Sequence, residues 1–141
     1  MPLLQERERQ QIQEMLQGMT DPIRLVVFTQ EVECQFCRET RQMAEEIAEL
    51  SDLINVEVYN FITDKEKAQE IGVDKIPAIV PIGKKDYGVR FYGIPSGYEF
   101  GAFIETLVDV STGDPDLLPE TKEALQKLNK PTHIQVFVTP T

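Results

Sequence analysis

A near-continuous apolar run at residues 23–29 (IRLVVFT) is the feature that most constrains the fold. Such a run is typical of a strand covered on both faces, because a strand with one face in water alternates apolar and polar residues. The sheet that contains it therefore needs helices on both sides. Helix-like and strand-like patterns do alternate along the sequence. We predict helices over 3–19, 34–50, 64–71, 98–110 and 119–128, and further strands over 55–61, 78–82 and 89–92.

These elements predict an α/β domain with a central mixed sheet of four strands, flanked by helices, and an extra helix at the N-terminal end. The first two strands should be parallel through a right-handed crossover. The last two should form an antiparallel hairpin around residues 83–86. Pro81 lies inside the third strand and has no backbone N–H, so it should lie at a sheet edge or a bulge.

The two cysteines of the chain, Cys34 and Cys37, lie where the first strand gives way to a helix. A zinc site would need four N or S ligands, but there is no second cysteine pair, and the single histidine, His133, is far away in the sequence. A purely structural disulfide is a weak alternative, because so small a ring removes little entropy from the unfolded chain. The unpaired N–H groups of a helix start favour a thiolate. The pair therefore predicts a dithiol/disulfide redox centre without a metal.

Length and charge restrict the partners and the compartment. A chain of 141 residues can bury one ordinary core, and its net charge of −10 argues against nucleic acid and anionic lipid as partners. No apolar segment is long enough to cross a membrane, and the N-terminal residues become charged too soon for a secretion signal. We therefore expect a cytoplasmic protein that docks other proteins. In a reducing compartment a close cysteine pair is more often catalytic than structural.

A strand–CxxC–helix opening, an Ile-Pro pair about forty residues after the second cysteine, and a closing hairpin and helix together resemble the thioredoxin/glutaredoxin fold. The segments 34–37 (CQFC), 89–100 (VRFYGIPSGYEF) and 135–141 (QVFVTPT) resemble more closely the glutaredoxin-like protein disulfide oxidoreductases of thermophilic archaea and bacteria. The resemblance covers essentially the whole chain. It implies a thioredoxin-like fold, a role in electron transport and cell redox homeostasis, and no cofactor other than the redox-active disulfide.

That family carries two thioredoxin-fold units in tandem, each with its own CxxC, which predicts three parts here. Residues 1–112 would form the unit with the CxxC, residues 113–132 a linker and helix, and residues 133–141 the first strand of an incomplete second unit. Residues 136–139 (VFVT) echo 26–29 (VVFT). The expectation is therefore a sequence truncated before the second CxxC. Because the stretch 134–138 is apolar on both faces, we expect it to add to a sheet edge or to pair with a second chain as a dimer.

Within the redox centre, Cys34 is the expected nucleophile, and Cys37 is expected to resolve the mixed disulfide. Arg38 and Arg41 each lie four residues after one of the cysteines and would stabilise a thiolate, whereas Glu33 would oppose it. These three residues are the candidate modulators of the nucleophile's pKa.

The substrate contacts are expected on two segments. The resemblance implies that the peptide bond before Pro77 is cis, that Pro77 faces the CxxC, and that the backbone of Ile76 is exposed for a substrate peptide to pair with as an added strand. Gln35 and Phe36 complete the expected substrate-binding residues. Thioredoxins usually carry a buried acid six residues before the nucleophile, where this chain has Phe28. Proton transfer must therefore use water, Glu33 or another group.

Three functions remain open at this point. The favoured one is a thiol-disulfide oxidoreductase that acts on protein disulfides, with a thioredoxin-reductase-like flavoprotein as electron donor. The second is a glutathione-dependent glutaredoxin, which is weakened because only Glu99 stands at the start of the helix that would hold a pair of acids. The third is a non-catalytic unit with a structural disulfide.

Overall fold

The computed structural model describes residues 1–139 and contains one four-stranded sheet in the order β2-β1-β3-β4. The strands are β1 at Ile23–Thr29, β2 at Ile54–Asn60, β3 at Ala78–Ile82 and β4 at Phe91–Tyr92. β1 is parallel to β2, and β3 is antiparallel to both β1 and β4. The predicted α/β class and mixed sheet are therefore confirmed.

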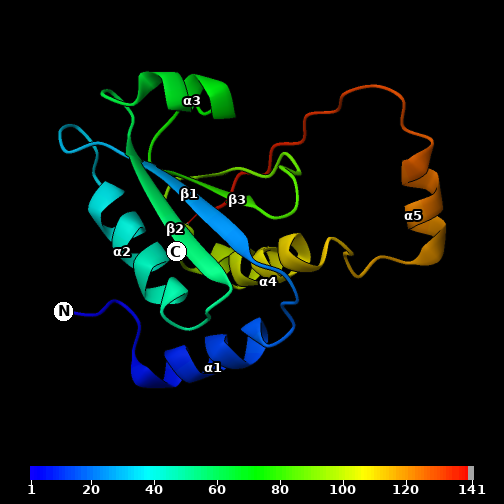
Figure 1. The fold of residues 1–141 in the computed structure, drawn as a ribbon, viewed down its shortest axis with the longest axis horizontal. Coiled ribbons are helices and arrows are strands. Elements are labelled where there is room, and N and C mark those ends of the chain that lie inside the picture. The colour runs from blue at the N-terminus through cyan, green and yellow to red at the C-terminus, as the bar shows by residue number, and fades with distance from the viewer. Residues whose placement is uncertain (140–141) are drawn as a thin grey trace.

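The helices cover the two faces of the sheet unequally (Figure 1). They are α1 at Glu6–Leu16, α2 at Cys37–Ala48, α3 at Lys65–Ile71, α4 at Tyr98–Thr112 and α5 at Pro119–Gln126. The core side chains of α1, α2 and α4 belong to one apolar cluster, and Ala68 of α3 belongs to another. α5 buries no residue and stands apart from the sheet.

Strand β1 joins the two apolar clusters, because its side chains alternate between the faces of the sheet. Leu25 and Val27 pack with α1, α2 and α4, whereas Val26 and Phe28 pack with α3. All four side chains are fully buried. The apolar run in the sequence is thus explained by burial on both faces, and β1 gives a rigid base to the loop that follows it.

Two predictions about the hairpin of β3 and β4, the position of Pro81 and the length of the last strand, fare differently. Pro81 lies opposite Leu25 of β1, and β4 pairs only with Ala78 and Ile79, so Pro81 lies on the part of β3 that β4 leaves uncovered. The predicted edge position is confirmed. The predicted strand over 89–92 is too long, since only its last two residues pair.

The connection of this hairpin is also longer than residues 83–86, because β3 ends at Ile82 and β4 begins only at Phe91. Arg90 lies in this connection. Its guanidinium donates to the Asp86 carboxylate over 2.7 Å and to the carbonyl of Ile71 over 2.7 Å. The ion pair holds the pKa of Asp86 below its usual value through the hydrogen bond from Arg90, although burial acts against this. These bonds tie the hairpin loop to the end of α3.

The predicted strand over residues 134–138 does not form. Residues 128–139 carry no helix or strand, and Ile134, Val136 and Phe137 are exposed. A strand needs a neighbour to accept and donate its backbone hydrogen bonds, and none of the described strands pairs with this segment. Pro140 and Thr141 lie outside the described residues. The assignment of residues 133–141 to a second unit therefore stays a prediction. Within residues 1–139, no helix is long and apolar enough to span a bilayer.

Candidate active site

The cysteine pair lies on the connection between β1 and α2. β1 ends at Thr29, residues 30–36 form bends, and α2 begins at Cys37. A disulfide joins Cys34 to Cys37 with their Cα atoms 5.6 Å apart. Cys34 is half-buried, whereas Cys37 is 2% exposed. The more accessible sulfur is therefore the first of the pair, as the sequence predicts for the nucleophile.

The start of α2 corrects the sequence prediction, which placed Cys34 at the first turn of the helix. Phe36 is the N-cap, its carbonyl accepts the N–H of Thr40 over 2.9 Å, and Cys37 is the first helical residue. Glu33 takes a positive φ of 56°, which turns the chain before the cysteine and is incompatible with a helix. The disulfide nevertheless holds the sulfur of Cys34 at the helix N-terminus, because its partner Cys37 is the first helical residue.

The disulfide opens into a shallow pocket of about 310 Å³. The residues that line it come from the end of β1, the following bend and the first turns of α2; they are Thr29, Gln30, Glu31, Cys34, Cys37, Arg38 and Arg41. The structure thus brings both cysteines and both candidate arginines into one site. The predicted residues Glu33, Gln35 and Phe36 lie on the same loop and are exposed, but they do not line this pocket.

The two arginines are not equivalent. The side chain of Arg41 donates to Glu45 on the next turn of α2 over 2.9 Å, so its charge is already partnered. The side chain of Arg38 makes no hydrogen bond or ion pair with any of residues 1–139. Arg38 is therefore the cation that is free to interact with a thiolate in this pocket.

The second predicted segment, the loop before β3, lies at the same edge of the sheet. β3 runs antiparallel to β1, and Ala78 at its start pairs with Phe28 near the end of β1. The Ile76–Pro77 peptide bond is cis, as the resemblance implied. Pro77 is buried, and its carbonyl accepts the N–H of Gly93 over 2.8 Å. Ile76 is half-buried, and its backbone makes no hydrogen bond within the described chain.

Two residues bear on the open questions from the sequence, Phe28 and Glu99. Phe28 is fully buried and stacks on Tyr59 with ring centroids 5.6 Å apart, so no acid occupies its position beneath the site. Glu99 lies in the first turn of α4, where burial raises the pKa of its carboxyl.

Among residues 1–139, no group of three or more histidine, cysteine or acidic side chains is placed to hold a metal ion.

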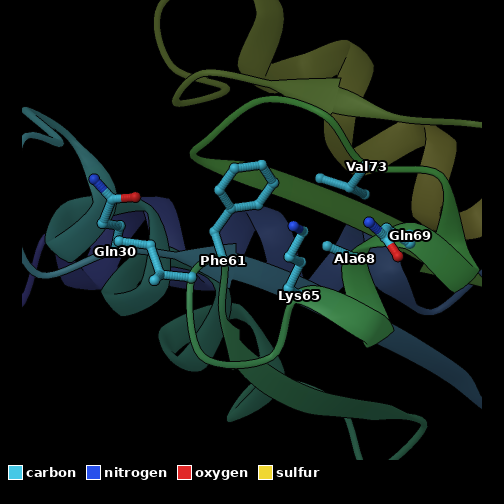
Figure 2. A pocket seen from close by; sticks show the side chains of 7 residues that line it. Gln30, Phe61, Lys65, Ala68, Gln69 and Val73 are labelled. Atoms are coloured by element: carbon cyan, nitrogen blue, oxygen red, sulfur yellow. The ribbon is translucent and has the colours of Figure 1, made fainter.

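A second pocket, of about 360 Å³, adjoins the dithiol pocket and was missed from the sequence (Figure 2). Its walls come from the end of β2, from α3 and from the residue that follows α3; they are Gln30, Phe61, Ile62, Lys65, Ala68, Gln69 and Val73. Gln30 lines both pockets. The available sequence signal was topological, because the carboxyl ends of the parallel strands β1 and β2 meet at one edge of the sheet.

Comparisons with known proteins agree with this geometry, although no family model matches the chain. A thioredoxin of Methanocaldococcus jannaschii is 32% identical over 75 residues, which are 52% of this chain and 82% of that protein. A protein disulfide oxidoreductase from Aeropyrum pernix superposes with a TM-score of 0.79 at 29% identity. The match covers 88% of this chain and 55% of the Aeropyrum chain.

The N-terminal domain of the alkylhydroperoxide reductase AhpF from Enterococcus faecalis also superposes with a TM-score of 0.79. At 24% identity this likeness concerns the fold alone, and it covers 90% of this chain and 62% of that one. The present chain thus spans less than two thirds of the length of either solved structure.

Proposed function

Because this chain belongs to the thioredoxin family, we propose that it is a thiol-disulfide oxidoreductase that acts on protein disulfides through a mixed disulfide. One observation carries the proposal. A half-buried Cys34 is bonded to a buried Cys37 at the N-terminus of a helix, in an open pocket with an unpaired arginine. An accessible sulfur that can be attacked, backed by a second sulfur that can displace it, is the arrangement that dithiol exchange requires.

In the reduced protein, the thiolate of Cys34 attacks one sulfur of a substrate disulfide. That S–S bond breaks, a Cys34–substrate disulfide forms, and the departing substrate thiolate takes up a proton. Cys37 then loses its proton and attacks the sulfur of Cys34, which releases the second substrate thiol and closes the Cys34–Cys37 disulfide. Two electrons have passed to the substrate, and a donor must return them before the next cycle.

The remaining residues have roles around this exchange. Arg38 stabilises the attacking thiolate, Arg41 contributes less because of Glu45, and exposed Glu33 opposes both. Glu31 lines the dithiol pocket and, through water, is the carboxylate we assign to receive the proton of Cys37.

The substrate chain lies across the two exposed residues of the CxxC and the loop before β3. Gln35 and Phe36 contact it from the loop, and the free N–H and carbonyl of Ile76 pair with it as with a neighbouring strand beside Pro77. Main-chain pairing of this kind accepts many sequences, which suits an enzyme for protein disulfides.

The partners follow from the same chemistry. They are proteins with accessible disulfides, and a thioredoxin-reductase-like flavoprotein that reduces the Cys34–Cys37 disulfide. We place the exchange in the cytoplasm, where the surroundings keep thiols reduced. We also propose that residues 1–112 form the catalytic unit, that 113–132 are a linker and helix, and that 133–141 are strand-forming residues of a further unit. In the absence of such a unit, the apolar tail pairs with a second copy of the chain.

Trapping of the mixed disulfide tests the function and the division of roles. Cys37→Ser should accumulate a covalent complex with a disulfide-bonded protein substrate, because nothing displaces the substrate from Cys34. Cys34→Ser should accumulate none and should lose disulfide reduction. Non-reducing electrophoresis and mass spectrometry would detect the complex. The reverse pattern would overturn the assignment, and a disulfide potential far below about −300 mV would favour a structural role.

A further inference from the structure

The pocket between the end of β2 and α3 has no role in the dithiol chemistry described above. Its walls are mainly apolar, formed by Phe61, Ile62, Ala68 and Val73. Its volume of about 360 Å³ lies near the lower end of the range for small-molecule sites, which is room for one or two large side chains. The pocket therefore suits an apolar group of limited size.

Two polar side chains of this pocket are unused by the protein itself. The side chains of Lys65 and Gln69 make no hydrogen bond or ion pair with any of the described residues, whereas the Gln30 amide donates to the carbonyl of Val32. In Figure 2 the side chain of Lys65 extends from α3 toward the space between Phe61 and Val73. A ligand that fills the pocket would meet an apolar wall and an unpaired ammonium, which complements an apolar group that has a carboxylate beside it.

The pocket adjoins the dithiol site, because Gln30 lines both pockets. The loop that carries the cysteines exposes two further apolar side chains, Val32 and Phe36. Arg38, Arg41 and the acid Glu31 line the dithiol pocket, and Arg41 is already paired with Glu45. In the second pocket Lys65 is the one charged lining residue, and it has no partner among the described residues. In a protein with a net charge of −10, this ammonium favours an acidic group at the second pocket.

We propose that this pocket is a specificity subsite for the substrate polypeptide. It takes one bulky apolar side chain near the target cysteine, and Lys65 pairs with an acidic residue next to it. The inference rests on the proposed function, which supplies the covalent attachment at Cys34. Because burying a large apolar side chain is favourable in proportion to its area, a substrate with this pair should bind more tightly than one without it.

Synthetic peptides test the subsite. Each has one cysteine bonded through a disulfide to a nitrothiobenzoate group, and carries Phe-Asp, Ser-Asp or Phe-Lys at a set distance of two to six residues on either side. The Cys34 thiolate forms a disulfide with the peptide and releases the coloured thiolate, which has the lower pKa and leaves faster. Cys37 then displaces the peptide thiol. Each reduced molecule reacts once, because the assay holds no reductant to reopen the Cys34–Cys37 disulfide. The dependence of this single-turnover release rate on peptide concentration gives kcat/KM for each peptide.

At one placement or more, we expect Phe-Asp to react with a kcat/KM at least tenfold above that of Ser-Asp, mainly through KM. Tenfold corresponds to about 1.4 kcal/mol. Lys65→Glu should reverse the preference between Phe-Asp and Phe-Lys. Lys127→Glu is the matched control, because Lys127 is an exposed lysine on the C-terminal side of α5, away from the pocket, and it should leave every ratio unchanged.

The outcomes separate the subsite from the function. Equal rates for the three peptides at every placement would overturn the subsite and leave the oxidoreductase intact. A preference for Phe-Asp that Lys65→Glu does not alter would overturn the assignment to this pocket. If reduced protein released no coloured thiolate from any peptide, the proposed function itself would fail, and the subsite with it.

Discussion

Single residues explain how two chemically identical cysteines differ. Cys37 begins α2 and is almost wholly buried, while Cys34 lies in the preceding bend and is partly open. This is why we propose Cys34 as the sulfur that reacts with a substrate. Nearby charge is also distributed unevenly, because Glu45 occupies Arg41 and leaves Arg38 without a partner among the described residues.

This difference predicts unequal effects of the two arginines. In a Cys37→Ser background, Arg38→Gln should slow the alkylation of reduced Cys34 by iodoacetamide at neutral pH about two- to fivefold, because a partly exposed charge interaction is worth roughly 0.4–1 kcal/mol. Arg41→Gln should change the rate by less than half as much. Alkylation rates measured from pH 5 to 9 give the thiolate fraction directly. Equal effects, or a larger effect at Arg41, would contradict the role given to Arg38.

At the scale of elements, the N-terminal segment is fastened across α2. The buried carboxylate of Glu46 accepts the backbone N–H groups of Leu3 and Leu4 at 2.8–3.1 Å, and Gln42 donates to the carbonyl of Met1. Burial opposes ionisation, but these N–H groups, with Gln42 and Arg9, hold the pKa of Glu46 below its usual value. The helix that carries the dithiol is thus braced by the segment that leads into α1.

The brace should be sensitive to acid. Because the folded-state pKa of Glu46 is depressed, its contribution to stability is complete above the unfolded value of about 4.3 and is lost as the pH falls through the folded value. Glu46→Ala should lower the free energy of unfolding at pH 7 by about 1.5–3 kcal/mol, as expected for buried hydrogen bonds to a charged group. Urea unfolding at pH 7 and pH 3 measures this. The difference between the two proteins should shrink at pH 3, and a constant difference would show that the carboxylate charge is not responsible.

At the scale of the whole molecule, the chain divides into a packed unit and an exposed extension. α4 ends at Gly113, which has a positive φ of 68° and donates its N–H to Asp109. Beyond it, α5 buries nothing, and Ile134, Val136 and Phe137 of the tail are exposed. Exposed apolar residues in one segment favour association with another surface.

A chain that ends at Asp114 tests this division, since it keeps the end of α4. It should be monomeric and should keep dithiol activity. Its free energy of unfolding should lie within about 0.5 kcal/mol of that of the full chain, compared at the same protein concentration, because no core residue is lost. The 141-residue chain should be dimeric by light scattering. Replacing Val136 and Phe137 with serine should return it to a monomer. A full chain that is monomeric at all concentrations would exclude pairing through the tail.

The sequence by itself determined the elements whose pattern depends only on neighbouring residues. The predicted strands 23–29 and 78–82 coincide with β1 and β3. Both strands are buried on both faces, which requires a run of apolar residues that can be recognised in the sequence. The redox role of the cysteine pair also followed from spacing, since only two residues separate the sulfurs and no other ligands accompany them. The helix predicted over 64–71 is α3 at Lys65–Ile71, and its end is equally local, because Gly72 takes the left-handed conformation that closes a helix.

Only the tertiary structure decided features that depend on partners far apart in the sequence. The first helical residue is Cys37 rather than Cys34, because the chain must turn at Glu33 on leaving β1. Which arginine lacks an ion pair depends on which of them the Glu45 side chain contacts. The second pocket exists because β1 and β2 end side by side, with Gln30 between the two sites. The tail shows the same limit, because residues 134–138 have the pattern of a buried strand but pair with no strand of residues 1–139. A pattern records what a segment can pair with, whereas pairing itself requires a second segment within hydrogen-bonding distance.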